Sequence, residues 1–298
     1  MKKIKLILAI LLVAILAVSA VRISWLDVFH IPGDSMEGAL KPDDLIILNK
    51  GLYDGVFANL LEKAGIESHP QVNDILVFRR SIADSDYYVK RCIGLPGDLI
   101  GIEHGKVRRN GSLMEDVPTI RHLYRLWYAN FPSLRTSLEN YGIPLFGPGY
   151  FRIPGSVYLY LDEGQRRMLS KEATIDSIRL ERTDLFHSQY GMASAGGDKM
   201  TIIDSMQAFI VPYKGWEMVL DSAHWTCYGN TILAHEGFNI RGAPGSGFYS
   251  GNRKIKTYVF KNDYYFLMGD NRDLSFDSRY FGCIPKKLIT GRLVCTIH

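Results

Sequence analysis

Most of the chain alternates short apolar runs with turn residues, a pattern typical of a β-rich protein. Apolar runs of strand length occur at 45–48 and 75–78, and a third begins at Tyr87 and continues to Ile93. Between 100 and 111, apolar positions alternate around Gly105 and end at Asn110-Gly111, which predicts a hairpin. Further strands are expected at 257–260, 264–268 and 288–295.

The middle of the chain, residues 112–256, has a different pattern. Apolar residues from Ile120 to Phe131 recur at helical spacing, and a less regular series from Met168 to Leu180 suggests a second helix. Strands are expected at 208–211 and 216–220. We interpret this range as an inserted α+β lobe.

The N-terminus predicts a membrane-associated segment. Three lysines precede an uncharged apolar run from Leu6 to Val21, which Arg22 ends. Sixteen residues fall short of the roughly 20 that span a bilayer, although the stem of Lys5 can extend the run. An uncleaved anchor and a cleaved secretory signal both fit, because Val18-Ser19-Ala20 is typical of a cleavage site. Either places the remaining chain outside the cytoplasm.

Charge and cysteine content narrow the classes of function that the chain can have. The net charge of +4 is spread over 66 charged residues, which does not favour nucleic-acid binding. The four cysteines contain no C-x-x-C pair, so a zinc site is not expected. We interpret them as small buried residues, and sequence leaves their pairing open. They are Cys92, Cys227, Cys283 and Cys295.

Two residues have candidate chemistry, although each taken alone fits a structural role better, as an ordinary turn serine and a solvated strand lysine. Ser35 lies in the tight turn Gly33-Asp34-Ser35-Met36, and a serine hydroxyl needs a base to become a nucleophile. Lys90 shares one face of a predicted strand with Tyr88 and Cys92. An apolar environment disfavours the charged amine, lowers its pKa and lets it act as a base. The motifs H-E-x-x-H, G-x-S-x-G and the P-loop are absent from the sequence.

The densest polar segment is 269–279, with three aspartates, two arginines and two serines between apolar stretches. Together with 31–36 and 88–98, it resembles the ordered motifs of bacterial type I signal peptidases. The resemblance covers 1–111 and 257–298, and the insertion lies where that family varies. It implies a mainly β fold: an N-terminal transmembrane anchor (1–22), a catalytic β domain (23–111 and 257–298) and the inserted α+β lobe (112–256).

The resemblance also implies roles for individual residues and a location. Ser35 falls on the nucleophile, Lys90 on the general base and Ser275 on the hydroxyl that orients the lysine amine. The expected substrates are exported preproteins with signal peptides, cleaved at the outer side of the bacterial cytoplasmic membrane without metal or cofactor. Loop ion pairs fall on Asp270, Arg272, Asp277 and Arg279, and walls of the substrate pockets fall on Ile31, Met36, Leu40 and Val89.

The sequence departs from the family pattern beside the nucleophile. The common Met-x-Pro-Thr-Leu is replaced by Met36-Glu37-Gly38-Ala39-Leu40, and Gly33 stands where many members carry a serine that helps stabilise the oxyanion. The resemblance therefore leaves the side-chain half of the oxyanion hole open.

Three alternatives are weaker. Gly33-Asp34-Ser35 also resembles a lipolytic esterase motif, which requires a later Asp-x-x-His such as Asp221 to His224, but this leaves Lys90 unexplained. A membrane-anchored scaffold with a degenerate peptidase fold is supported only by the changes after Ser35. A self-cleaving repressor with a Ser–Lys pair is disfavoured by the N-terminal apolar run and the lack of a predicted DNA-binding helix pair.

Overall fold

The computed structural model describes residues 10–11, 25–31, 33–51, 53, 63–64, 69–145, 150–181, 205–237, 240–243 and 247–297. These residues form a mainly β protein, as expected. The predicted anchor, 1–22, lies outside the described residues except for Ile10 and Leu11. Across the part of the chain that is described, no helix combines the length and the apolar character needed to cross a bilayer.

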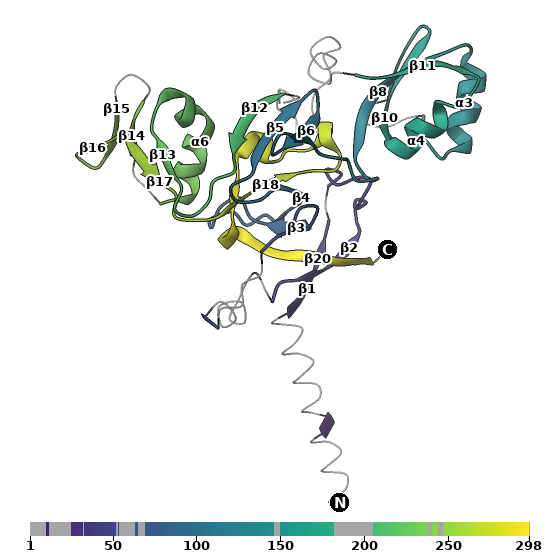
Figure 1. Ribbon diagram of the computed structural model, residues 1–298. Helices are drawn as coiled ribbons and strands as arrows, with labels where there is room; N and C mark the ends of the chain where they lie inside the picture. The colour runs from purple at the N-terminus through teal and green to yellow at the C-terminus, as the bar shows by residue number, and fades with distance from the viewer. Residues whose placement is uncertain are drawn as a thin grey trace, which may run out of the picture.

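The catalytic domain is built on a seven-stranded sheet that joins the two ends of the chain. The C-terminal strand β20 lies between β2 and β3, so segments far apart in sequence are neighbours (Figure 1). All pairings in this order are antiparallel, and the strands predicted here are confirmed. The order is β1 (Leu26–His30), β2 (Leu45–Asn49), β20 (Ile289–Ile297), β3 (Ile75–Phe78), β4 (Tyr88–Gly94), β18 (Tyr264–Met268) and β19 (Ile284–Pro285).

A second sheet contains the predicted hairpin. Strands β5 (Leu99–Glu103) and β6 (Lys106–Arg109) pair antiparallel. The turn between them has positive φ at His104 (50°) and Gly105 (75°), as a two-residue hairpin turn requires. Strand β7 (Ser112–Leu113) and strand β12 (Met206–Ile210) complete the order β12-β5-β6-β7.

Residues 121–180 form a separate lobe. Its four-stranded sheet has the order β11 (Ile175–Leu180), β8 (Arg121–Tyr128), β10 (Ser156–Asp162) and β9 (Phe151–Ile153). Helices α3 (Phe131–Asn140) and α4 (Glu163–Leu169) share a core with this sheet. In Figure 1 the lobe projects from the central domain on the side opposite to α6 (Ser222–His235).

The expected helix over 120–131 was wrong, because this segment is strand β8. Strand β8 pairs with β10 on one edge and β11 on the other. Its two faces are also covered by different clusters, Leu126 by the α3 and α4 core and Leu123 by Tyr158. An apolar strand buried on both faces loses its period-two pattern, so its spacing resembled that of a helix. The expected helix over 168–180 was wrong for most of its length: only Met168 and Leu169 belong to a helix, α4, and Ile175–Leu180 is strand β11.

Residues 205–256 lie apart from that lobe and pack on the catalytic domain. Strand β12 pairs with β5, and β13 (Glu217–Val219) pairs with β17 (Thr257–Val259), as strands were predicted. Tyr228 and Ile232 of α6 share one buried cluster with Ile93 and Phe266. The range 112–256, expected as one lobe, therefore occupies two places. The remaining strands here are β14 (Ile240–Ala243), β15 (Gly247–Ser250) and β16 (Arg253–Ile255).

Candidate active site

Ser35 and Lys90 meet although 55 residues separate them. Ser35 lies in a turn between β1 and β2, and Lys90 is in the middle of β4. The Lys90 Nζ is 2.6 Å from the Ser35 Oγ and donates a second hydrogen bond of 3.0 Å to the Val89 carbonyl. The sequence-predicted nucleophile and base are thus within direct proton-transfer distance.

The Lys90 amine is held in an apolar environment. Only 3% of the residue is exposed. Its pKa is lowered from 10.5 to about 8: burial is the main cause and the Arg279 charge adds to it, while the negative charges of Asp277, Asp34 and Asp270 oppose the shift. A substantial fraction of Lys90 is therefore neutral near physiological pH, as a general base must be.

The polar segment 269–279 lies against the nucleophile turn. A Cβ at Gly269 would lie 2.4 Å from the Ser35 carbonyl oxygen and 2.2 Å from the Ser275 Oγ, so only glycine fits there. Asp277 and Arg279 form a fully buried ion pair at 2.9 Å, and Asp277 also accepts from the Gly269 N–H at 3.1 Å. Burial alone would raise the pKa of Asp277, but the charge and hydrogen bonds of Arg279, together with the Gly269 N–H and the Lys90 charge, outweigh it and keep the pKa below its usual value.

The other two loop charges do not pair with each other. Asp270 accepts two hydrogen bonds, of 2.7 and 2.5 Å, from Arg91 of β4, and a third of 2.6 Å from Thr119. Arg272 is buried, and its Nε and Nη1 have no hydrogen-bond partner among the described residues. Its carbonyl instead accepts a hydrogen bond from Arg279. Arg91 is therefore a supporting residue that sequence reasoning missed, although it is adjacent to Lys90.

Ser275 lies in the site without a hydrogen bond to Lys90. It is fully buried, and its Oγ has no partner among the described residues. The Ser275 Oγ and the Ser35 carbonyl oxygen both lie against Gly269, on the side where a Cβ would be. Its predicted role in orienting the lysine remains a prediction.

Asn271 was also missed by sequence reasoning, and it holds the nucleophile turn from the loop side. Its backbone N–H donates to the Ser35 carbonyl at 3.2 Å, and its Nδ2 donates to the Asp34 carbonyl at 3.2 Å. Asn271 lies inside the polar segment 269–279, but nothing in the sequence distinguished one amide from the seven ionic or hydroxyl residues around it.

The departures after Ser35 contact the inserted lobe. Gly38 has φ of 108°, and a Cβ there would lie 2.1 Å from the Thr119 carbonyl oxygen. Glu37 forms an ion pair of 2.9 Å with Arg121, the first residue of β8. The proline of the family pattern, which falls on position 38, would therefore clash with the segment that leads into the lobe.

The four predicted pocket-wall residues lie together. Ile31, Met36 and Leu40 are buried in one apolar cluster, and Val89 packs against it. The cluster borders Ser35 on one side, since Met36 is the next residue in the turn.

The histidines named for the esterase alternative lie elsewhere. Asp221 caps α6 and pairs with His224 at 2.9 Å, on a helix that shares the Tyr228 cluster rather than the Ser35 cluster. His30 ends the other such string, Asp27 to His30, which precedes Ser35 in the chain, and it pairs with exposed Asp43 at 3.1 Å. All four cysteines are free, and the interpretation as buried residues was wrong for the exposed Cys227 and Cys295.

Comparison with known proteins identifies the family. Residues 3–134 and 246–297 match the profile of the signal peptidase family, peptidase S26. The chain belongs to this family. It is a serine endopeptidase.

Relatives named signal peptidase I extend the match. The chain is 25% identical to one from Buchnera aphidicola subsp. Acyrthosiphon pisum over 94% of its own length and 70% of the relative. It is 24% identical to one from Aquifex aeolicus, over 95% of this chain and 79% of the relative. A shorter match to one from Pseudomonas fluorescens reaches 40% identity over 73 residues, 24% of this chain and 25% of the relative.

Proposed function

We propose that this protein is a membrane-bound peptidase that removes N-terminal signal peptides from exported preproteins, with Ser35 as nucleophile and Lys90 as general base. The observation that carries the proposal is the 2.6 Å approach of a buried lysine amine to the Ser35 hydroxyl. The likeness to proteins named signal peptidase I supports the substrate class.

In this mechanism neutral Lys90 takes the Ser35 proton as the Ser35 Oγ attacks the scissile carbonyl. The backbone N–H of Ser35 stabilises the oxyanion. Protonated Lys90 then donates to the leaving amine, and the acyl-enzyme remains on Ser35. Lys90, neutral again, activates a water that releases the signal peptide. Buried Asp277 and Arg279 fix the loop without touching the substrate.

The backbone around Lys90 supports binding of an extended substrate. Strand β18 pairs with β4 only as far as Arg91. Among the described residues, Tyr88 to Lys90 therefore have a strand partner only on the β3 side. A peptide can add along the other edge. The bulky walls Ile31 and Val89 would leave shallow depressions, so we expect small substrate side chains one and three positions before the cut.

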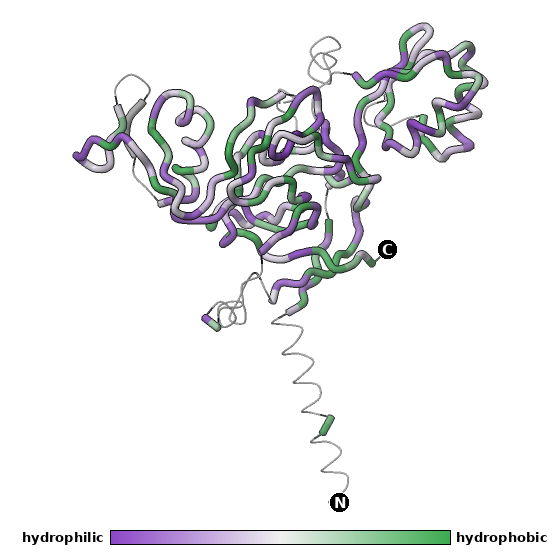
Figure 2. The backbone as a smooth tube through the Cα atoms, in the orientation of Figure 1, coloured by the Kyte–Doolittle hydropathy of each residue, from purple (hydrophilic) through white to green (hydrophobic). Residues whose placement is uncertain are grey.

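Exposed apolar side chains support a membrane location. Five lie on the adjacent strands β1, β2 and β20, close to where the chain enters the sheet from its N-terminus (Figure 2). Such a patch is typical of a surface that meets a membrane or a protein. We propose the outer face of the bacterial cytoplasmic membrane. The five are Leu26, Val28, Leu45, Val294 and Ile297, between 39% and 57% exposed.

The test is cleavage of a preprotein whose signal ends in Ala-x-Ala, with the cut located by mass spectrometry. We expect the unmutated protein to cut after the last alanine, and Ser35→Ala and Lys90→Ala each to abolish cleavage. Because the two act as a unit, the double variant should be no worse than either single one. Lys41→Ala, which changes an exposed lysine near the same turn, is the matched control. Substantial cleavage by Lys90→Ala would overturn the proposed base.

A further inference from the structure

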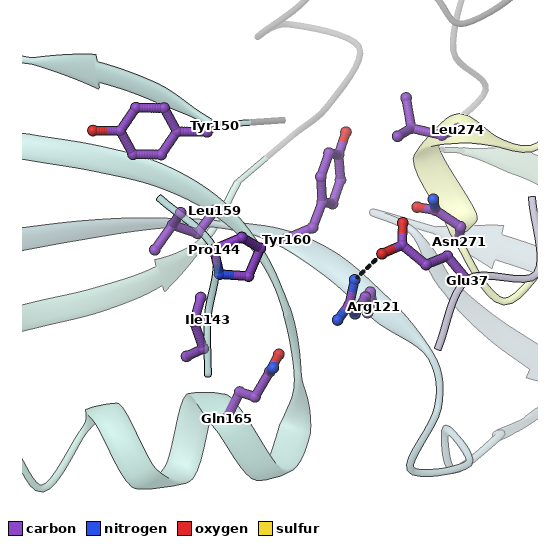
Figure 3. Close-up of a pocket in the computed structure, with 10 residues that line it drawn as sticks. All are labelled: Glu37, Arg121, Ile143, Pro144, Tyr150, Leu159, Tyr160, Gln165, Asn271 and Leu274. Carbon is purple, nitrogen blue, oxygen red and sulfur yellow. Dashed lines mark hydrogen bonds and ion pairs between the residues drawn. The ribbon is translucent and has the colours of Figure 1, made fainter. Parts of the chain in front are cut away.

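A cavity lies between the nucleophile turn and the inserted lobe. It has a volume of about 180 Å³. Figure 3 shows Glu37, Asn271 and Leu274 on the catalytic side, facing lobe side chains, with the Arg121–Glu37 ion pair crossing between them. The lobe side is formed by Ile143, Pro144, Tyr150, Leu159, Tyr160 and Gln165.

The cavity is next to the reacting serine. Glu37 follows Ser35 by two residues, and Asn271 donates to the carbonyls of Asp34 and Ser35 at 3.2 Å. Met36 is buried in the apolar wall, whereas Glu37 turns to the lobe. The cavity and the wall therefore lie on opposite sides of the turn. A peptide whose signal-peptide end lies on the wall continues past Ser35 toward the cavity.

The lobe is fixed to this place by direct contacts. The Thr119 Oγ1 donates to Asp270 at 2.6 Å, and the Arg121 N–H donates to the Asp270 carbonyl at 3.2 Å. The Thr119 carbonyl also occupies the space where Gly38 would carry a side chain. The cavity is therefore built against the nucleophile turn, and the departure at Gly38 leaves room for the segment that leads into the lobe.

The lining indicates what the cavity accepts. The lobe wall is mostly aliphatic and aromatic, and the two charges present, on Glu37 and Arg121, neutralise each other. A dry cavity of about 150 Å³ holds a benzene molecule, so about 180 Å³ suffices for one large side chain. The Asn271 Oδ1 and the Arg121 Nε have no hydrogen-bond partner among the described residues, so the polar end retains unused hydrogen-bonding capacity.

We propose that this cavity is a substrate subsite on the mature-protein side of the scissile bond, where the inserted lobe selects one uncharged, medium-to-large side chain. The inference rests on the proposed function. It assigns the lobe a role in specificity, with Tyr160 as a specificity-determining residue.

The first test uses peptides with one constant signal-peptide end. Each of the first four positions after the cut is varied separately among Ala, Leu, Phe, Asp and Lys. We expect one position at which Leu or Phe is cut with higher kcat/KM than Ala, and Asp and Lys with lower. Tyr160→Ala should reduce that preference on the order of tenfold. Tyr213→Ala, at an exposed tyrosine outside the cavity lining, should leave it unchanged.

The second test does not depend on how Tyr160→Ala folds. A peptide with a photoreactive phenylalanine at the preferred position is bound to the Ser35→Ala protein, irradiated and mapped by mass spectrometry. We expect crosslinks to 143–165, and crosslinks confined to other residues would overturn the subsite. Equal cleavage of all residues at all four positions would also overturn the subsite while leaving the peptidase intact. No cleavage of any peptide would instead overturn the proposed function, and with it the subsite.

Discussion

At the scale of single residues, the chemistry of the site depends on the burial of its polar side chains. Lys90 is only 3% exposed, and burying an unpaired ammonium is costly because the charge loses its hydration. The structure meets this cost by lowering the pKa rather than by supplying a carboxylate in contact with the amine. A lysine in this state is suited to accept a proton.

The first prediction is a pH dependence set by Lys90. The neutral amine is the active form, so activity should be lost below the pKa and rise with pH through about 8. One pKa governs this limb, so kcat/KM should fall about tenfold per pH unit well below it. Measuring kcat/KM on one peptide from pH 6 to 10.5 checks this. A rate that still climbs beyond pH 10 would mean that the base is an ordinary solvated lysine.

The second prediction concerns Gly33. Its φ lies outside the left-handed region, and a Cβ there would meet nothing within 4 Å, so a side chain fits without strain. Many family members carry at this position a serine whose hydroxyl stabilises the oxyanion. If the site lacks that donor, Gly33→Ser should raise turnover up to several-fold, well under the roughly 10²–10³-fold effect typical of one donor. Gly33→Ala is the matched control and should be neutral. Equal losses in both variants would show that backbone freedom is what Gly33 supplies.

At the scale of elements, the loop 269–279 is held from three directions. The ion pair of Asp277 and Arg279 closes it internally, Arg91 of β4 holds Asp270, and Asn271 joins it to the nucleophile turn. The loop therefore holds the Ser35 turn and strand β4 at a fixed distance from each other. Gly269 in this loop is required because the Ser35 carbonyl oxygen and the Ser275 Oγ lie too close to leave room for a side chain, and not because of a turn conformation.

The third prediction tests Ser275 in that loop. Removing a buried hydroxyl that has no hydrogen-bond partner in the described part of the chain should not destabilise the fold, so Ser275→Ala should unfold at the unmutated temperature or slightly above it. If the hydroxyl orients the Lys90 amine during catalysis, kcat should fall with little change in KM. The measurement is kcat and KM beside thermal unfolding, with Ser112→Ala at an exposed strand as control. Unchanged kcat would remove Ser275 from the site.

At the scale of the whole molecule, the lobe and the surface that we propose to face the membrane lie at different ends. Figure 1 places β1 and β20 at the end of the catalytic domain that the N-terminal segment joins, and the lobe sheet at the far end. A substrate anchored in the same bilayer would place its signal-peptide end on the apolar wall and the residues that follow the scissile bond in the lobe cavity. Sharing one membrane surface also raises the effective concentration of enzyme and substrate.

The fourth prediction is that the N-terminal apolar segment is retained. The protein should remain in the membrane fraction after a high-salt wash, because the attachment is hydrophobic rather than electrostatic. N-terminal sequencing of the membrane-derived protein should begin at or near Met1. A start at Val21 would mean cleavage after Ala20, and release by salt would mean a peripheral attachment.

The sequence by itself determined the elements whose signals are local. Strands β2, β3, β4 and β18 and the hairpin at 104–105 follow from apolar runs bounded by turn residues, and these were predicted correctly. Ser35 and Lys90 were predicted as a pair because the spacing of the motifs around them resembled one family. Their mutual distance is not a local property, and no pattern within either segment contains it.

Only the tertiary structure decided the rest. Strand β8 resembled a helix because neighbours cover both of its faces, and burial by distant segments leaves no period in the sequence. Arg91 and Asn271 were missed because their partners, Asp270 and the Ser35 carbonyl, come from elsewhere in the chain. Gly38 was an unexplained departure and Glu37 had no predicted role, because their partners Thr119 and Arg121 come from the inserted range. Contacts of this kind depend on close packing of segments far apart in sequence, which only the folded chain establishes.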